Sequence, residues 1–193
     1  MRDAHLIIVT GPPGAGKTTI AGGLGPRLSL PVLHKDAFKE AIVDEVGAPD
    51  LAGSQLAGRA AFAALYAGAG ALLDAAVGVI VEANFTRGRS EGGLRSLASR
   101  AAETVILQCE APSSVVVGRY RERMGSRHPA HFDADRLAAV ERAVTDRANY
   151  DLDIDVARLI RVDTSGPAPR PSVDELASAI GPGAVLALGV TTR

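Results

Sequence analysis

Five short apolar runs recur along the chain, and a segment of helical length follows each of the first four. The runs lie at residues 4–10, 31–34, 77–83, 104–109 and 158–163, and they include the strings LIIVT, VIVEA and VILQC. Continuous β-branched and aliphatic residues are typical of strands that are covered on both faces, as the strands of a parallel sheet are. The alternation of such runs with helical segments therefore predicts an α/β fold built on a parallel sheet.

Helices are predicted over residues 17–28, 36–46, 53–76, 91–101, 112–123, 135–149 and 172–180. Asp135 and Ser172 are expected to cap the last two, because their side chains can accept from the free N–H groups of a helix start. Pro112 stands where a first-turn proline is tolerated. The polar stretch MGSRHPAHFD, residues 124–133, fits neither periodicity and is predicted to be a surface loop or mobile flap.

The length of 193 residues fits one domain over residues 1–193. The apolar tail, residues 181–193, is predicted to be a docked strand or a loose end. Neither this tail nor the first apolar run approaches the ~20 residues that a membrane helix needs. We therefore expect no membrane partner.

Charge and cysteine content exclude several function classes. The chain has 21 Lys and Arg against 22 Asp and Glu, a net charge of −1, so it lacks the cationic excess of a nucleic-acid-binding surface. Its single cysteine, Cys109, cannot form an internal disulfide, and no Cys and His residues show zinc spacing. These features predict a cytoplasmic protein, disfavour a nucleic-acid partner, and leave the oligomeric state open.

A glycine-rich segment directly follows the first predicted strand and opens the first predicted helix. Residues 11–18, GPPGAGKT, match the pattern GxxxxGK[ST]. Glycines let backbone N–H groups turn toward an anion, and the helix N-terminus adds partial positive charge. Lys17 is expected to reach the β- and γ-phosphates of a nucleoside triphosphate, and Thr18 to offer its hydroxyl to Mg²⁺. The alternative is a glycine-rich turn with an ordinary surface lysine.

Asp36, just after the second strand, is the candidate general base. The guanine-reading string NKxD of switch GTPases does not occur, whereas small kinases place a carboxylate at this point of the chain. Phosphoryl transfer depends mainly on positioning and charge neutralisation, so Asp36 can align an acceptor hydroxyl and accept its proton. Alternatively, Asp36 only caps the next helix. Lys39 is expected to keep Asp36 ionised or to meet an anionic substrate, or else to be a solvated i,i+3 partner.

The third strand ends in VIVEANFTRG, residues 79–88. Glu82 stands where P-loop proteins usually carry an acid that holds Mg²⁺ through water; alternatively it pairs with an arginine at the edge of the core. Ligands bind at the carboxyl edge of an open α/β sheet, so Asn84 is expected to address a substrate hydroxyl, while Thr86 caps the next turn. The predicted substrate-binding residues are Lys39, Glu82, Asn84 and Arg87.

Three arginines, Arg119, Arg123 and Arg127, repeat every four residues and would form a stripe if the helix persisted. Such a stripe could close over nucleotide phosphates and stabilise the transferring group, so residues 119–133 are predicted to be a lid. The alternative is a solvated arginine-rich face. His128 and His131 lack a third ligand at metal spacing, and they are expected to serve lid structure or substrate contact.

Together, GPPGAGKTT, HKDAFKE, VIVEANFTRG and RYRERMGSRHPAH resemble the P-loop kinases related to chloramphenicol phosphotransferase, the zeta toxins and the 5′-kinase domain of polynucleotide kinases. The resemblance covers roughly residues 6–163. It implies a three-layer sandwich of sheet order 2-3-1-4-5 with ATP as donor. It also implies a nucleotide site at Gly11, Pro12, Pro13, Gly14, Ala15, Gly16, Lys17, Thr18, Thr19 and Arg119, and a catalytic set of Asp36, Lys17, Arg123 and Arg127.

The chain departs from the family pattern at two places. The third strand often ends in Asp where this chain has Glu82, which leaves the magnesium role of that position open and is similar to the substrate-facing Glu of the zeta toxins. The paired strand-two acids of shikimate kinases are absent, so shikimate is disfavoured as a substrate.

These observations predict an ATP-dependent kinase that moves the γ-phosphoryl group to a hydroxyl of a small molecule, such as an antibiotic, sugar, nucleoside or nucleotide-sugar. A polynucleotide 5′-hydroxyl kinase is the alternative, although the net charge and the aromatic content of 4% offer neither a cationic groove nor stacking platforms. A non-catalytic ATP-binding regulator is a third interpretation, which would tolerate loss of Asp36 but not of Lys17. The identity of the acceptor and the choice between ATP and GTP stay open.

Overall fold

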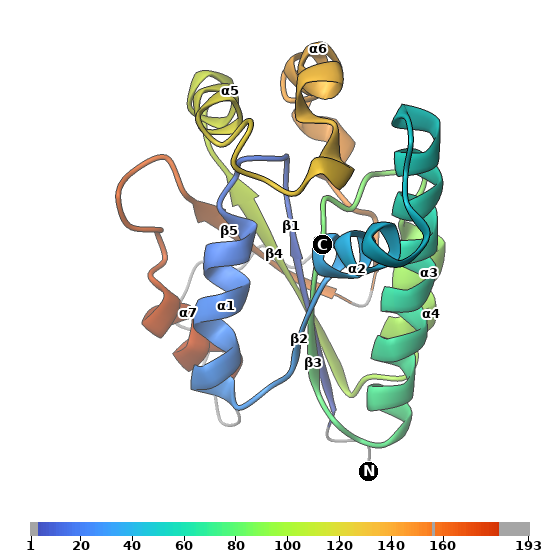
Figure 1. Ribbon diagram of the computed structural model, residues 1–193. Coiled ribbons are helices and arrows are strands. Elements are labelled where there is room, and N and C mark those ends of the chain that lie inside the picture. The colour runs from blue at the N-terminus through green and yellow to red at the C-terminus, as the bar shows by residue number, and fades with distance from the viewer. Residues whose placement is uncertain (1–3, 156, 182–193) are drawn as a thin grey trace.

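The computed structural model describes residues 4–155 and 157–181 and has a five-stranded parallel sheet at its centre (Figure 1). The strands follow the order β2-β3-β1-β4-β5. Their bounds are β1 His5–Thr10, β2 Val32–His34, β3 Val79–Glu82, β4 Glu103–Glu110 and β5 Ala157–Asp163. The predicted α/β fold and the sheet order implied by the family resemblance are both confirmed.

Helices cover both faces of this sheet (Figure 1). Their bounds are α1 Lys17–Leu28, α2 Lys35–Val46, α3 Leu51–Asp74, α4 Glu91–Ala98, α5 Ser113–Glu122, α6 Asp133–Ala143 and α7 Val173–Ile180, with 3₁₀ turns at η1 Pro129–His131 and η2 Arg147–Tyr150. Side chains alternate between faces along a strand, so β1 supplies Leu6 and Ile8 to one core and Ile7 and Val9 to the other.

Each core cluster joins the sheet to a particular pair of helices. On one face, residues of α3 and α4 such as Leu65 and Leu94 pack on β1 and β3. On the other face, residues of α1 and α7 such as Leu24 and Leu176 pack on β1 and β4. The result is the expected three-layer sandwich.

The predicted lid, residues 119–133, runs from the end of α5 to the start of α6. These two helices lie above the carboxyl ends of the strands (Figure 1). Val116 and Tyr120 of α5 pack against Val140 of α6 and against Val144, which follows it, in a cluster separate from the two main cores. This separate cluster holds the two helices together as a unit.

Several predicted boundaries are wrong. Helix α6 spans Asp133–Ala143 rather than 135–149, and Phe132, in the left-handed conformation (φ 49°), rather than Asp135, holds its N-cap position. Asp133 is the first residue of the helix, and its carboxylate accepts hydrogen bonds from Tyr120 and Arg127. Ser172 is confirmed as a cap, since its hydroxyl accepts from Glu175 N–H in a capping box.

The strand predicted at 77–83 is shorter, because Val77 N–H donates to Leu72 O and closes the end of α3. The predicted strand or loose end at residues 181–193 lies, apart from Gly181, outside the described residues.

Helix α3 is the only described helix that is long and apolar enough to cross a membrane by length and composition. A third of its most apolar window is buried, and Ala61, Leu65 and Ala69 contribute to the core against the sheet. Core helices of this kind pass the same test, so this observation is weak evidence for a membrane helix.

Candidate active site

The glycine-rich loop between β1 and α1 is held so tightly that two of its positions accept only glycine. Gly11 (φ 139°) and Gly14 (φ 92°) have backbone conformations that other residues rarely adopt. A Cβ atom would lie 2.4 Å from Cys109 O at Gly11 and 2.6 Å from Val116 O at Gly14. The loop is therefore clamped between β4 and the first turns of α5, with α1 beginning at its far end.

Lys17 is enclosed by this loop, and its side chain is 7% exposed. Its Nζ donates to Pro12 O at 2.9 Å, a carbonyl of the loop itself. Burial lowers the pKa of Lys17, while the nearby carboxylate of Glu82 opposes that shift. Among the described residues, Pro12 O is the only hydrogen-bond acceptor of this buried ammonium, which is therefore well suited to exchange it for phosphate oxygens.

Thr18, in the first turn of α1, lies next to Glu82, the last residue of β3. Thr18 Oγ1 donates to Glu82 Oε2 at 3.5 Å, and His34 Nδ1 lies 2.9 Å from the same oxygen. The alternative partner predicted for Glu82, an arginine, is thus wrong. The hydrogen bond from His34 raises the pKa of that histidine. A hydroxyl and a single carboxylate fit Mg²⁺, which prefers oxygen ligands and keeps several waters beside a bound phosphate.

Asp36 lies in the first turn of α2, where His34 rather than Asp36 holds the N-cap position. Lys35 Nζ donates to Asp36 Oδ1 at 3.1 Å, and Arg127 donates to Oδ2 at 2.8 Å. Burial alone would raise the pKa of Asp36, but the charges of Lys35, His131 and Arg127 lower it far below its usual range. Asp36 is therefore ionised at any working pH, with its two oxygens held by cations.

The three lid arginines do not form the predicted stripe. Helix α5 ends at Glu122, and Gly125 (φ 81°) turns the chain before Arg127. Arg127 nevertheless reaches the site from the loop, where it also donates to Asp133 at 2.9 Å. Arg119 donates to Thr164 O at 2.7 Å, and Thr164 in turn donates to Ala15 O of the glycine-rich loop.

Arg123 is the lid arginine that has no anionic partner among the described residues. Its guanidinium carbon lies 5.2 Å from the centre of the Tyr120 ring, and its Nε is buried without a hydrogen-bond acceptor. Burial, followed by the charge of Arg127, lowers its pKa. An orphaned donor of this kind is costly unless a ligand fills its place, so Arg123 is a candidate anion ligand.

Acidic side chains on one face of α2 form ion pairs with the lid. Asp36, Glu40 and Asp44, spaced four residues apart, pair with Arg127, His131 and His128 in that order, with polar atoms 2.8 Å, 2.6 Å and 2.9 Å apart. Lys39 is 1% exposed and donates to Ala130 O and to Ser54 Oγ, both at 2.7 Å. The alternative of a solvated Lys39 is wrong, because its ammonium anchors η1 to α2 and α3.

A cavity of about 870 Å³ opens next to Asp36. Of the predicted residues, Asp36, Lys39, Asn84 and Arg127 line it, together with Pro13 of the glycine-rich loop. Glu82 does not line the cavity and lies beside Thr18. Arg87 is exposed and does not line the cavity either; its backbone N–H donates to Asn149 O. Other lining residues were not predicted, because no motif in the sequence marks them; among them are Lys35, Arg59, Phe62, Tyr66, Arg89, Asp133 and Arg136.

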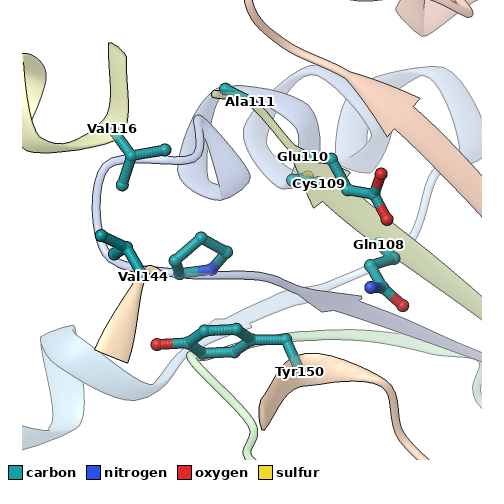
Figure 2. Close-up of a pocket in the computed structure, with 8 residues that line it drawn as sticks. Gln108, Cys109, Glu110, Ala111, Val116, Val144 and Tyr150 are labelled. Atoms are coloured by element: carbon teal, nitrogen blue, oxygen red, sulfur yellow. The ribbon is translucent and has the colours of Figure 1, made fainter. Parts of the chain in front are cut away.

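A second, much smaller cavity of about 20 Å³ lies between the glycine-rich loop, the end of β4 and the lid helices. Figure 2 shows Gln108 and Glu110 on one side of it, with Val116, Val144 and Tyr150 toward the other. It has room for about one water molecule. Burial raises the pKa of the adjacent Cys109 thiol to about 12, so this thiol is not an activated nucleophile. The larger cavity is the candidate acceptor site.

Comparison with known proteins matches residues 6–146 to the family model described as "AAA domain". A crystal structure of a "putative kinase" from Chloroflexus aurantiacus J-10-fl has 34% sequence identity and a TM-score of 0.80, covering 92% of this chain and 96% of that one. None of the curated protein sequences gives a significant match.

Two further structures share the fold. A sugar kinase from Janibacter sp. HTCC2649 is 22% identical with a TM-score of 0.55, over 91% of this chain and 90% of that one. A chain of the Pnkp1/Rnl/Hen1 RNA repair complex is 18% identical with a TM-score of 0.52, over 78% of this chain and 48% of that one. The sheet order and these similarities confirm the P-loop kinase fold.

Proposed function

The chain belongs to the AAA domain family, and from this premise we propose that it is an ATP-dependent phosphotransferase acting on a hydroxyl of a small molecule. One observation carries the proposal. Asp36, an ionised carboxylate, lines a cavity that begins at Pro13 of the glycine-rich loop and is large enough for a small substrate. A protein that only bound a nucleotide would need neither this larger cavity next to its phosphate loop nor an ionised carboxylate lining it.

In this proposal, ATP places its phosphates on the backbone N–H groups of residues 11–19, and Lys17 exchanges its bond to Pro12 O for phosphate oxygens. Thr18 and Glu82 would hold Mg²⁺, the latter through water. Magnesium bound there would offset charge on the β- and γ-phosphates. Arg119, which already contacts Thr164 beside the loop, would contact the nucleotide.

Asp36 would accept a hydrogen bond from the acceptor hydroxyl and point its oxygen at the γ-phosphorus. Its lowered pKa makes it a weak base, so it would first align the hydroxyl and then accept the proton late, in a loose transition state. Arg127 holds Asp36 Oδ2, and Arg123, whose Nε has no acceptor in the described part of the chain, offers its guanidinium to the transferring group. Lid contacts with α2 would exclude water that otherwise hydrolyses ATP.

The size of the cavity favours a small acceptor over a polynucleotide. About 870 Å³ lies within the range of pockets that hold one small molecule. The similarity to a chain of an RNA repair complex concerns the fold alone at 18% identity. Because the cavity size favours a small acceptor, a polynucleotide 5′-hydroxyl kinase is the second candidate function.

The first test is a screen for ADP release from MgATP, with sugars, nucleosides, nucleotide-sugars, hydroxylated antibiotics and a 5′-hydroxyl oligonucleotide as acceptors. We expect at least one small molecule to raise ADP release above the rate with water alone, and Lys17→Ala to abolish the increase. Stimulation by the oligonucleotide alone would favour the second candidate. MgATP binding without stimulation by any acceptor would favour a non-catalytic regulator.

A further inference from the structure

The cavity beside Asp36 has an unbalanced positive charge. Six lysine and arginine side chains line it, against two carboxylates, those of Asp36 and Asp133. Both carboxylates already have cationic partners: Lys35 and Arg127 contact Asp36, and Arg127 also contacts Asp133. Lining arginines without a carboxylate partner in the described part of the chain are Arg59, Arg89 and Arg136.

These three arginines converge from separate elements. Arg59 lies on α3, Arg89 in the segment between β3 and α4, and Arg136 on α6, and all three line the same cavity. The charge of Arg136 acts across it, because the pKa of Lys39 falls to about 8 through burial, the charge of Lys35 and then that of Arg136. Arg59 and Arg89 are exposed and Arg136 is half-buried, so all three guanidinium groups are accessible to an anion that enters the cavity.

The nucleotide phosphates do not account for this charge. The glycine-rich loop contributes only Pro13 to the cavity, and neither Lys17 nor Arg123 lines it. An aromatic cluster lines the same cavity: Phe62 and Tyr66 have ring centres 6.0 Å apart, Phe85 packs 5.8 Å from Phe62, and Lys35 Nζ lies 5.5 Å from the centre of the Phe62 ring. The positive charge therefore lies where the acceptor would bind.

We propose that the acceptor is an anionic hydroxyl compound, and that Arg59, Arg89 and Arg136 hold its phosphate or carboxylate group while Asp36 faces the hydroxyl. This inference rests on the proposed phosphotransferase function and narrows its substrate class. Guanidinium groups suit both anions, because their paired N–H donors match two oxygens at once. Neutral sugars, nucleosides and uncharged antibiotics would leave the three arginines without a partner.

The test begins with protein saturated by a non-hydrolysable MgATP analogue, so that the glycine-rich loop is occupied. Pyrophosphate, ribose 5-phosphate, ribonate and ribose are then titrated by calorimetry into the wild type and into Arg59→Gln/Arg136→Gln. The control is Arg121→Gln, which removes an exposed α5 arginine that pairs with Glu141 outside the cavity.

We expect at least one anion to bind ten times more tightly than ribose, and the double variant to weaken that binding at least tenfold while the control does not. Preference for ribose 5-phosphate or for ribonate identifies the anionic group as phosphate or carboxylate. Equal binding of ribose and the anions, absence of anion binding, or anion affinity unchanged in the double variant overturns the inference. Failure of the MgATP analogue itself to bind would instead overturn the proposed function.

Discussion

Replacing Asp36 by Asn separates a phosphotransferase from a nucleotide-binding protein. The amide has nearly the shape of the carboxylate but cannot accept the proton, and it loses the ion pairs with Lys35 and Arg127. The Asp36 side chain is 47% exposed, and the amide oxygen of Asn can still accept a hydrogen bond from the enclosed Lys35 ammonium, so the loss of stability should be about 2 kcal/mol. Arg127 keeps its second partner, Asp133. The variant should therefore fold.

The rate should respond far more strongly than the stability. Loss of general-base assistance typically lowers turnover by about 10² to 10⁴, while MgATP affinity should change by less than about threefold, or ~0.7 kcal/mol. Steady-state ADP release with the acceptor found by screening, or slow hydrolysis with water as acceptor, gives turnover, and calorimetry gives affinity.

The matched control is Asp44→Asn, which removes an exposed carboxylate of the same helix that pairs with His128 of the lid and does not line the cavity. Near-wild-type turnover of Asp36→Asn would refute the reasoning and leave Asp36 as a structural ion-pair partner. An equal loss of turnover in Asp44→Asn would mean that lid docking, not the carboxylate at the cavity, sets the rate.

Three further outcomes are expected. Lys17→Ala removes an ionic hydrogen bond worth roughly 1.5–3 kcal/mol and should weaken MgATP binding at least about tenfold by calorimetry; unchanged affinity would contradict the nucleotide site. Hydrogen exchange across residues 119–133 should slow when a nucleotide analogue binds, and equal protection with and without it would indicate a static lid. Burial lowers the pKa of Lys39 from 10.5 to about 8, so the unfolded chain binds more protons between these values. The stability of the wild type relative to Lys39→Met should therefore rise from pH 8 toward pH 10.5 in urea titrations, and a difference independent of pH would contradict this effect.

Local signals in the sequence account for the sheet and the phosphate loop. Strands β1, β3 and β4 are covered on both faces, so their apolar runs are nearly continuous. The motif GxxxxGK[ST] predicts a phosphate-binding loop between a strand and a helix. Asp36 was also predictable, because its place after the second strand fixes it at the carboxyl edge of the sheet.

Contacts between distant segments could not be predicted. Arg127 meets Asp36 across 91 positions of sequence, and the arginine spacing that suggested a helical stripe breaks at Gly125. Arg59, Arg89 and Arg136 have no shared motif, and only the folded chain brings them to one cavity. Lys39 was placed correctly near Asp36, but its burial against Ala130 depends on where the lid docks.

Transfer of label from [γ-³²P]ATP tests the central claim most directly. The protein is incubated with Mg²⁺, labelled ATP and the small-molecule fraction of an extract from its own cells, and the products are separated by charge and identified by mass spectrometry. We expect a labelled phosphomonoester that is absent with Lys17→Ala and strongly reduced with Asp36→Asn. Label found only in ATP and inorganic phosphate would contradict the claim that this fold transfers a phosphoryl group to a small-molecule hydroxyl.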